Sequence, residues 1–390
     1  MTRTASPALA GMRVVDLATI VAAPAVAETL GDFGAEVIKV EPPKGDEARR
    51  MGGHFHGINR NKRGMALDLS GPEGREVLMR LLDWTDVLVE NFKPGTMEKW
   101  GIGYADHLEK RFPRLIHCRV SGFGSNGPYS RYPGYDGVGQ AFGGLMSVNG
   151  EPDGPPMRIG VPLADMMAGA LATNAVLIAY VERQRSGRGQ FVDISLMDAA
   201  MVQARPAVPD WILTGKQPQR WGSRHVFAAP HDVFPTRDGH IFLTGAMDPQ
   251  FRRTCDVLGR PDIADDPRFA TMAKRHENVD ALNALLREIL AEWDSVALAE
   301  ALLEANVPAG AVLDLPAAYR HPQAQAREML IEAADGYRGI GSPLKLSRTP
   351  MSVDRSPPAF GQHGREILAE LGYGDAEIER LVADGIAPAG

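Results

Sequence analysis

The stretch MRVVDLATIVAAPAVAETLGDFGAEVIKVE, residues 12–41, decides the fold class of this chain. It starts with a run typical of a buried parallel strand (residues 12–17), continues with a helical pattern (residues 24–33) and ends with a second strand (residues 35–41). Together they form one βαβ unit. The alternation continues with a predicted helix and three predicted strands, over residues 72–83, 86–91, 115–121 and 191–196. We therefore predict an α/β fold with an open parallel sheet and helices on both faces.

The turn between the first strand and the first helix, TIVAAPA (residues 19–25), argues against a nicotinamide dinucleotide as the ligand. A dinucleotide fingerprint needs glycines in this turn, because the backbone must approach a pyrophosphate closely. No GxGxxG pattern is present here. The βαβ unit is therefore not interpreted as an NAD site.

Length, charge and cysteine content narrow the class of protein. With 390 residues, the chain is long enough for two domains, each with its own core. A net charge of −7 and the lack of a long Lys/Arg block argue against a nucleic-acid surface. Two cysteines far apart in the sequence, Cys118 and Cys255, indicate a reducing compartment and no zinc site. We expect a cytoplasmic protein without a metal, in which residues 1–12 form a short mobile tail without a signal-peptide core.

The pattern of predicted strands and helices changes near residue 216. Two apolar runs flank an Asp238-Gly239 turn, which is typical of a β-hairpin. Helical patterns follow over residues 250–258, 280–292 and 295–305, and two more are predicted over residues 364–371 and 376–383. Residues 227–320 therefore look like a smaller α+β domain. We divide the chain into residues 1–226, 227–320 and 321–390.

One ionisable side chain, Asp165, stands in the otherwise uncharged run IGVPLADMMAGALATNAVLIAYV (residues 159–181). Asp is almost never fully buried without a partner, so this carboxylate either lies on a solvent face or serves a purpose. Pro162 fits the first turn of a helix, where backbone N–H groups and the macrodipole favour an ionised Asp165. In poor solvent this carboxylate is a better nucleophile than in water. The alternative is an Asp that only stabilises the start of the helix.

The same run is long enough to suggest a transmembrane helix. Pro162, Gly169, Thr173 and Asn174 interrupt it together with Asp165. We therefore predict a buried amphipathic helix and no membrane association.

Two basic loops are candidates for binding a phosphorylated ligand. The first follows the strand over residues 86–91, at the kind of strand end where α/β sheets bind ligands. Its amide, aromatic and ammonium groups suit phosphates and a flat ring; they are Asn91, Phe92, Lys93 and Lys99. The second, NRNKRG (residues 59–64), supplies Arg60 and Lys62 as a candidate phosphate cradle. The alternative for both is an ordinary solvated surface.

Two glycine-rich segments, residues 121–129 and 134–146, either let the backbone approach a ligand or simply make turns. Tyr135 and Gln140 are the polar residues there that we expect to face a site. The histidines form no triad-like or HExxH motif, so we expect surface or core roles for them.

Taken in order, five blocks of this sequence resemble the family III CoA-transferases. They are LATIVAAPAVAETLGDFGAEVIKVEPP (residues 17–43), GINRNKRGMALDL (residues 57–69), DVLVENFKPGTMEKWGIGY (residues 86–104), SGFGSNGPYSRYPGYDGVGQAFGGLM (residues 121–146) and VPLADMMAGALATNAVLIAYVERQRSGRGQFVDISLMDA (residues 161–199). Formyl-CoA:oxalate transferase typifies this family, and α-methylacyl-CoA racemase is a relative. The resemblance runs from about residue 11 to GQHGREIL (residues 361–368). The NRNK, VENF and GRGQ blocks are far more specific in this order than singly.

The resemblance implies a reaction with covalent intermediates. Asp165 matches the family's catalytic carboxylate, which attacks an acyl-CoA thioester to form an acyl-aspartyl anhydride and then an aspartyl-CoA thioester. Water must be kept out, because it would hydrolyse the anhydride. By position, CoA would be contacted by Ile20, Val21, Ala22, Asn91, Phe92, Lys93 and Lys99, while Tyr135 and Gln140 would face the acyl group. No tightly bound cofactor is implied, since CoA and acyl-CoA are substrates.

The resemblance also implies an architecture. Family members fold as interlocked homodimers, in which each chain has a large Rossmann-like domain built from both termini and a small inserted domain. Residues 1–226 and the return segment 321–390 would form the large domain here, and residues 227–320 the small one.

The sequence departs from the family pattern at two places. Some members have Arg after the acid that matches Glu41, whereas this chain has Pro42, so one adenine or phosphate contact is in doubt. The tetraglycine loop that shields the intermediate in the formyl-CoA enzyme is absent, and residues 219–231 occupy its region. Shielding would then come from other residues, for which Trp221 and Gly222 are candidates.

Substrates and alternatives remain open at this point. RWGSRH (residues 220–225) resembles a segment of the dicarboxylate-using branch, so Arg220 or Arg224 would pair with a distal carboxylate. We predict a dicarboxylic acid acceptor, with succinyl-CoA as a candidate donor. An acyl-CoA racemase is the first alternative, but Tyr135 stands where that branch has His, and a phenol is a poor base at neutral pH. A CoA-binding protein without turnover is the second alternative.

Overall fold

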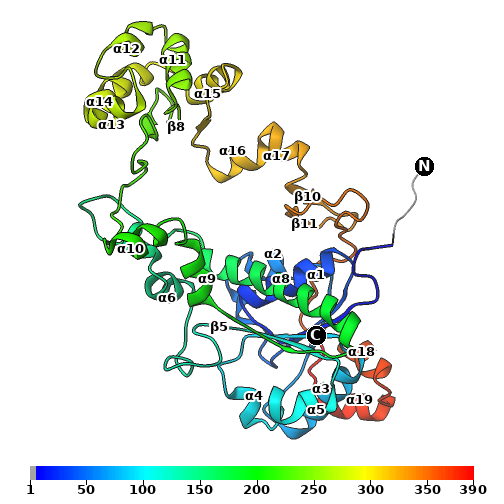
Figure 1. Cartoon of the computed structure of the whole chain (residues 1–390). Coiled ribbons are helices and arrows are strands. Elements are labelled where there is room, and N and C mark those ends of the chain that lie inside the picture. Colours follow the sequence, from blue (N-terminus) through cyan, green and yellow to red (C-terminus); the bar gives the residue numbers. More distant parts are fainter. Residues whose placement is uncertain (1–5) are drawn as a thin grey trace. The chain divides into compact units, whose positions relative to one another are not determined.

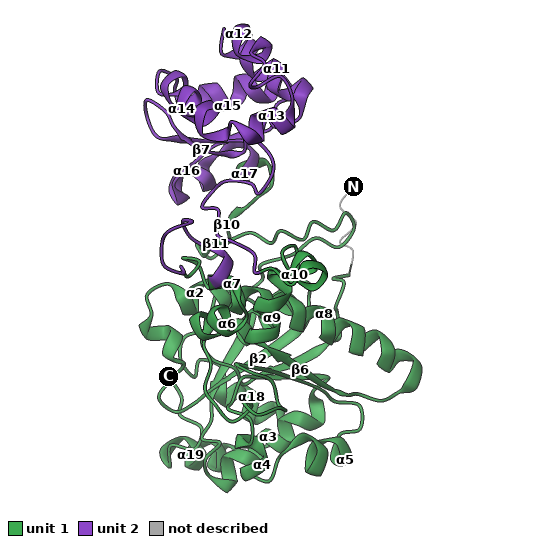
Figure 2. Ribbon diagram, turned by 60° about the vertical axis from the view of Figure 1, so that its left-hand side comes forward, with its two compact units in different colours: residues 1–146, 158–216, 325–390 green, residues 147–157, 217–324 purple. Residues whose placement is uncertain are grey.

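The computed structural model describes residues 6–390, which form two compact units. Unit 1 contains residues 6–146, 158–216 and 325–390, and unit 2 contains residues 147–157 and 217–324 (Figure 2). The small domain expected over residues 227–320 falls within unit 2. Unit 2 also takes in residues 147–157, which the sequence analysis assigned to the large domain.

A six-stranded parallel sheet forms the centre of unit 1. Its strands are β1 (Arg13–Asp16), β2 (Glu36–Glu41), β3 (Lys62–Ala66), β4 (Val87–Glu90), β5 (Ile116–Ser121) and β6 (Phe191–Ser195). They are arranged in the order β3-β2-β1-β4-β5-β6, and Val14 of β1 pairs with Val37 of β2 on one side and Val87 of β4 on the other. The predicted α/β fold with an open parallel sheet is confirmed. Strand β3 was missed, because its first residues read as a basic loop.

Helices cover both faces of this sheet (Figure 1). On one face, α1 (Ala22–Asp32), α8 (Leu163–Ser186) and α9 (Leu196–Gln203) pack on strand residues such as Val14 and Val89. On the other face, α3 (Pro72–Trp84), α18 (Gly364–Glu370) and α19 (Asp375–Ala383) pack on residues such as Val15 and Leu88. Strand side chains alternate between the two cores, as the period of two in a strand requires. The C-terminal segment therefore completes the core of unit 1.

Shorter elements connect this framework. They are η1 (Glu47–Arg50), α2 (His54–Ile58), α4 (Thr96–Lys99), η2 (Tyr104–Leu108), α5 (Glu109–Arg111), α6 (Asp136–Phe142), α7 (Leu145–Val148), α10 (Val208–Thr214), α17 (Pro322–Ala326), β10 (Leu330–Glu332) and β11 (Arg338–Ile340). The chain first passes into unit 2 within α7 and returns to unit 1 at residue 158. It enters unit 2 again at residue 217 and returns to unit 1 within α17.

Unit 2 is an α+β unit with its own core. Its antiparallel sheet has the order β7-β8-β9, with β7 (Asp232–Pro235), β8 (His240–Leu243) and β9 (Ala309–Ala311). Its helices are α11 (Asp248–Val257), α12 (Pro261–Asp265), α13 (Met272–Glu277), α14 (Val279–Leu290), α15 (Ser295–Glu304) and α16 (Leu315–Arg320). The predicted hairpin at Asp238-Gly239 is confirmed, because β7 and β8 pair on either side of it. Phe234, Phe251 and Leu286 are buried in the core.

Two expectations about single segments need correction. Of the expected tail, residues 1–5 lie outside the described residues, but Leu9 donates its N–H to Phe33 and Met12 is fully buried, so this part packs on unit 1. Helix α8 is buried along one face, through Ala168, Ala172 and Val176, but exposes an apolar stripe on the other. Among residues 6–390, it is the one helix long and apolar enough to cross a bilayer.

Candidate active site

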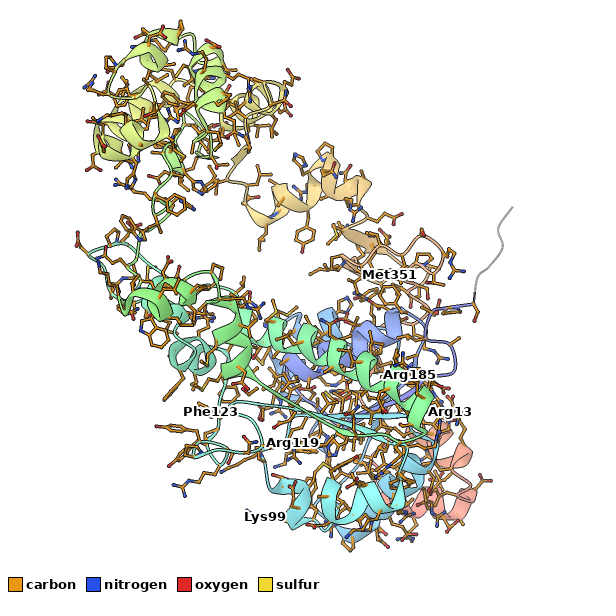
Figure 3. All side chains as sticks on the ribbon, in the orientation of Figure 1. Arg13, Lys99, Arg119, Phe123, Arg185 and Met351 are labelled. Atoms are coloured by element: carbon orange, nitrogen blue, oxygen red, sulfur yellow. The ribbon has the colours of Figure 1, made fainter. Side chains whose placement is uncertain are left out.

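A cavity of about 290 Å³ lies in unit 1 at the carboxyl ends of β1, β4 and β5. This is the point where the strand order reverses, because the chain crosses from β3 to β4 past β1, and ligands bind there in open α/β sheets. Figure 3 marks this end of β5 by Phe123, opposite Arg13 at the start of β1. The cavity is lined by Thr19, Ile20, Val21, Ala22, Glu47, Asn91, Phe92, Lys93, Pro94, Val120, Ser121, Gly122, Tyr132, Pro133, Gly134, Tyr135, Asp165 and Leu196.

Asp165 is the third residue of α8 and lines this cavity with its side chain half-buried. Within residues 6–390, the carboxylate has no ion-pair partner. The expectation that the helix start favours its ionised form is wrong. Burial, followed by the negative charge of Asp136, raises the pKa of Asp165 from 3.8 to about 6. The carboxylate is therefore unusually basic for an Asp.

The helix N–H groups do not favour ionised Asp165 because another carboxylate uses them. Asp136, in the first turn of α6, accepts a 2.8 Å hydrogen bond from the N–H of Ala164 and a 3.4 Å one from the N–H of Asp165. Its other oxygen accepts from the Gln140 amide at 2.8 Å and lies 3.4 Å from the Arg158 guanidinium. The sequence analysis did not identify Asp136 as a site residue. It predicted no helix over the glycine-rich residues 134–146, and an acid is a recognisable signal only in the first turn of a predicted helix.

Gln140 was expected to face the cavity, but it does not line it. Its side chain is fully buried, and its amide oxygen accepts from the N–H of Ile159 at 2.9 Å. It therefore holds Asp136 and the segment before α8 in place. Tyr135, the neighbouring prediction, does line the cavity and is 65 % exposed.

The turn before α1 lines the cavity with Ile20, Val21 and Ala22, as expected. Ile20 has a positive φ of 71°, which is uncommon for a β-branched residue and costs about 1–3 kcal/mol. Two side chains hold this conformation. Asn91 accepts from the N–H of Thr19 at 2.9 Å and donates to its carbonyl at 2.8 Å, and the buried Asp46 accepts from the N–H of Ile20 at 3.2 Å. Asn91 thus shapes the cavity as well as lining it.

The loop after β4 contributes Phe92 and the exposed Lys93 to the cavity. Phe92 also contacts Trp100 edge-on, at 5.2 Å between ring centroids. A second, largely apolar cavity of about 200 Å³ lies beyond it and includes Pro42, Pro43 and Trp100 in its wall. Lys99 does not line either cavity: it ends α4 and is exposed (Figure 3).

Arg60 and Lys62 are not placed as a phosphate cradle, which corrects the prediction. Lys62 is fully buried and donates to Asp16, Asn59 and the Pro24 carbonyl, each at 2.9 Å. Arg60 is 4 % exposed and forms two hydrogen bonds to Asp32. Both cations are committed to groups of unit 1. Lys62 starts β3, an edge strand whose residues are all buried, and Arg60 lies just before that strand.

The predicted ligands for a distal carboxylate, Arg220 and Arg224, already have partners within unit 2. Arg220 donates to the carbonyls of Glu151 and Gly154, at 3.2 and 2.6 Å. Arg224 forms an ion pair with Asp280 at 2.9 Å. Gly222, a candidate for shielding, donates its N–H to Gly150 at 3.0 Å. Arg220 and Gly222 therefore secure residues 147–157 to the rest of unit 2, whereas Arg224 pairs elsewhere in that unit.

The chemistry available in the cavity is that of a carboxylate. Within residues 6–390, no group of three or more His, Cys, Asp or Glu side chains is arranged to hold a metal ion. Asp165 faces apolar neighbours such as Val21 and Leu196, which are poor at solvating a charge. A basic carboxylate in such surroundings can attack a carbonyl carbon, and Lys93 supplies positive charge at the wall.

Comparisons with known sequences and structures show which proteins this chain resembles. The sequence pattern of CoA-transferase family III matches residues 9–364. The chain is 36% identical to the succinate–glutarate CoA-transferase of Agrobacterium fabrum, over 94% of this chain and 96% of the relative. It is 39% identical to the succinyl-CoA–D-citramalate CoA-transferase of Chloroflexus aurantiacus, over 92% and 93%. Among solved structures, a CAIB/BAIF family protein from Brucella suis has a TM-score of 0.88 and 37% identity, and the match covers 94% of this chain and 100% of that one.

Proposed function

This chain belongs to CoA-transferase family III, and on that premise we propose that it transfers CoA from succinyl-CoA to a dicarboxylic acid through covalent intermediates on Asp165. The observation that carries the proposal is the position of Asp165. Its carboxylate lies in a cavity at the switch point of the sheet, half-buried and without a cation partner among residues 6–390. The succinyl-CoA and dicarboxylate parts rest on the substrates named for the two relatives above.

The proposed reaction keeps the energy of the thioester through four acyl transfers. The Asp165 carboxylate attacks the donor carbonyl, the C–S bond breaks, and CoA leaves as a thiolate from a mixed anhydride. The thiolate attacks the aspartyl carbonyl of that anhydride and releases the donor acid as a carboxylate. The acceptor carboxylate then attacks the aspartyl-CoA thioester, which forms a second anhydride and frees the thiolate again. The thiolate finally attacks the acceptor's carbonyl, and Asp165 leaves as a carboxylate.

The residues around the two cavities suit CoA. In the proposal, Ile20, Val21 and Ala22 contact the pantetheine arm, and Lys93 pairs with a phosphate. The second cavity takes the adenine, since a flat ring packs well on Pro42, Pro43 and Trp100. This assignment replaces the Arg contact that some family members have after the position of Glu41.

We also propose that the protein works as a homodimer in the cytoplasm. Large apolar side chains are exposed on α8 and α10 of unit 1, including Ile178 (69 %) and Leu213 (82 %). An apolar surface of this kind is typical of a protein–protein interface. The cytoplasmic location rests on Cys118 and Cys255, which are both free thiols. Light scattering of the purified protein tests the dimer.

The test of the proposed function is an assay with succinyl-CoA and a panel of mono- and dicarboxylic acids. We expect acyl exchange with dicarboxylic acceptors, and hydroxylamine or borohydride added during turnover should modify Asp165, as read by peptide mass spectrometry. CoA transfer only to monocarboxylates would contradict the acceptor class. Rapid deuterium uptake at the α-carbon of a 2-methylacyl-CoA, without any acid added, would instead support a racemase. CoA binding without modification of Asp165 would support a non-catalytic role.

A further inference from the structure

Asp136 accepts hydrogen bonds from the backbone of the proposed nucleophile and of the residue before it, and it takes no part in the reaction described above. It is 7 % exposed, and it is the N-terminal residue of α6. Its Oδ1 accepts from the backbone N–H groups of Ala164 and Asp165, and its Oδ2 faces Gln140 and Arg158. The carboxylate thus connects two charged or polar side chains to the first turn of α8.

We propose that Asp136 is a positioning residue for Asp165, and that Arg158 and Gln140 hold Asp136 in that role. The first turn of a helix leaves N–H donors without intrahelical partners, and a residue near that turn usually caps them. Here the cap comes from α6, 28 residues earlier in the sequence. The Asp165 side chain is therefore not used for capping and remains available to the cavity. The proposal rests on the proposed function in one respect, that Asp165 is the nucleophile.

The electrostatic consequence follows from two carboxylates placed close together. The negative charge of Asp136 disfavours ionisation of Asp165 and adds to burial, which is the larger cause, in raising the pKa of Asp165. A more basic carboxylate is a stronger nucleophile towards a thioester. Arg158 opposes this effect, since its guanidinium lies 3.4 Å from Asp136 with the side chain 49 % exposed. Asp136 and Arg158 therefore act in opposite directions on the basicity of Asp165, which burial raises most.

Other ionisable groups surround Asp165, and the experiment must separate them from this pair. Glu47, Lys93, Tyr132 and Tyr135 line the same cavity. Of the helices packed against α8, α1 carries Glu28 and Asp32 and α9 carries Asp198. The causes that raise the pKa of Asp165 are burial and, after it, Asp136 alone.

The experiment uses two substitutions with opposite expected effects on the same group. Asp136→Asn keeps an oxygen that can accept from the Ala164 N–H but removes the negative charge. Arg158→Gln removes the positive charge from a half-exposed side chain and leaves the cap intact. Arg185→Gln is the matched control, because Arg185 is exposed near the opposite end of α8 (Figure 3). Arg158→Lys is the conservative variant that should restore the wild-type behaviour.

The first readout is the titration of the Asp165 carboxylate, followed by NMR of ¹³C-labelled aspartate and identified by the signal that Asp165→Asn removes. We expect the midpoint to fall by about one pH unit in Asp136→Asn, to rise by a smaller amount in Arg158→Gln, and to stay unchanged in Arg185→Gln. A role in helix capping alone would move neither midpoint. Unmoved midpoints in both folded variants would overturn the proposal, and Arg158→Gln provides this test even if Asp136→Asn does not fold.

The second readout is the pH profile of kcat/KM for CoA transfer, whose acid limb should move in the same directions. A loss of kcat that is equal at every pH would indicate a capping role only and would count against the proposal. The two readouts also separate this inference from the proposed function. If the NMR midpoints shift as expected while no variant or wild type transfers CoA, the positioning role stands and the proposed function fails.

Discussion

Unit 1 contains two sets of buried charges that differ in how completely they are paired. Around Lys62 the pairing is complete: all three ammonium protons have acceptors, and one of these, Asp16, lies between Lys62 and Lys39. Although burial acts to raise the pKa of Asp16, the two ammonium groups lower it below 3.8. At the cavity, no residue in the described part of the chain gives Asp165 such a cation, and burial raises its pKa to about 6. The comparison indicates that a buried charge with every partner in place is structural, whereas one left without partners is available for chemistry.

The largest effect should follow from removing the unpaired carboxylate. We expect Asp165→Asn to lower kcat for CoA transfer by about 10⁴-fold or more, because the proposed anhydrides and the aspartyl-CoA thioester all form on this carboxylate. The measurement is the steady-state rate with succinyl-CoA and the best acceptor. Asp198→Asn is the matched control, since Asp198 is an exposed acid in the first turn of α9 and should change kcat little. Transfer at the wild-type rate by folded Asp165→Asn would contradict the whole interpretation of the cavity.

The second prediction concerns the paired charges around Lys62, and the change removes one of them. Lys62→Met should lower the free energy of unfolding by about 3–5 kcal/mol, because it leaves a buried charge on Asp16 with one cation fewer. Urea denaturation followed by circular dichroism measures the change in midpoint. The exposed pair Arg80–Glu76 gives the control, since Arg80→Gln should change stability by less than about 1 kcal/mol. A stable Lys62→Met protein with weakened CoA binding would restore the phosphate-cradle interpretation and undo the comparison.

The third prediction concerns the stability cost of the unpaired carboxylate. Raising the pKa of Asp165 from 3.8 to about 6 disfavours the ionised form by up to about 3 kcal/mol in the folded protein. The contribution of Asp165 to stability therefore falls as pH rises from about 4 to about 6, since the folded state holds a proton that the unfolded state has lost. Asp165→Asn should be more stable than the wild type at pH 7.5 and gain less at pH 4. Urea midpoints at both pH values measure this, and a less stable variant at pH 7.5 would be contrary to it.

Local patterns in the sequence predicted five of the six strands of the parallel sheet and the position of Asp165 near the start of a helix, but they did not predict partners. The alternation of apolar runs is a property of neighbouring residues, and so is an isolated acid in an uncharged run. Partners come from the tertiary fold. Lys62 meets Asp16 across 46 residues, and Asp136 meets Ala164 across 28. For this reason NRNKRG read as a surface loop, and Gln140 read as a cavity residue, when both are held in the interior.

The smallest effect is expected from removing the charge of Lys93, which is exposed in the free protein and which we propose pairs with a phosphate of CoA. Lys93 lines the cavity, and Lys99, six residues later, does not. If Lys93 pairs with a phosphate of CoA, Lys93→Gln should raise KM for succinyl-CoA about fivefold, which corresponds to roughly 1 kcal/mol, with kcat unchanged. Lys99→Gln should leave both constants unchanged and serves as the control. An equal rise in KM for both variants would mean that long-range attraction, and not a contact at the cavity, brings CoA to the protein. Such a result would mean that Lys93 is an ordinary solvated surface charge. It would then belong neither with the paired charges around Lys62 nor with the reactive carboxylate at the cavity.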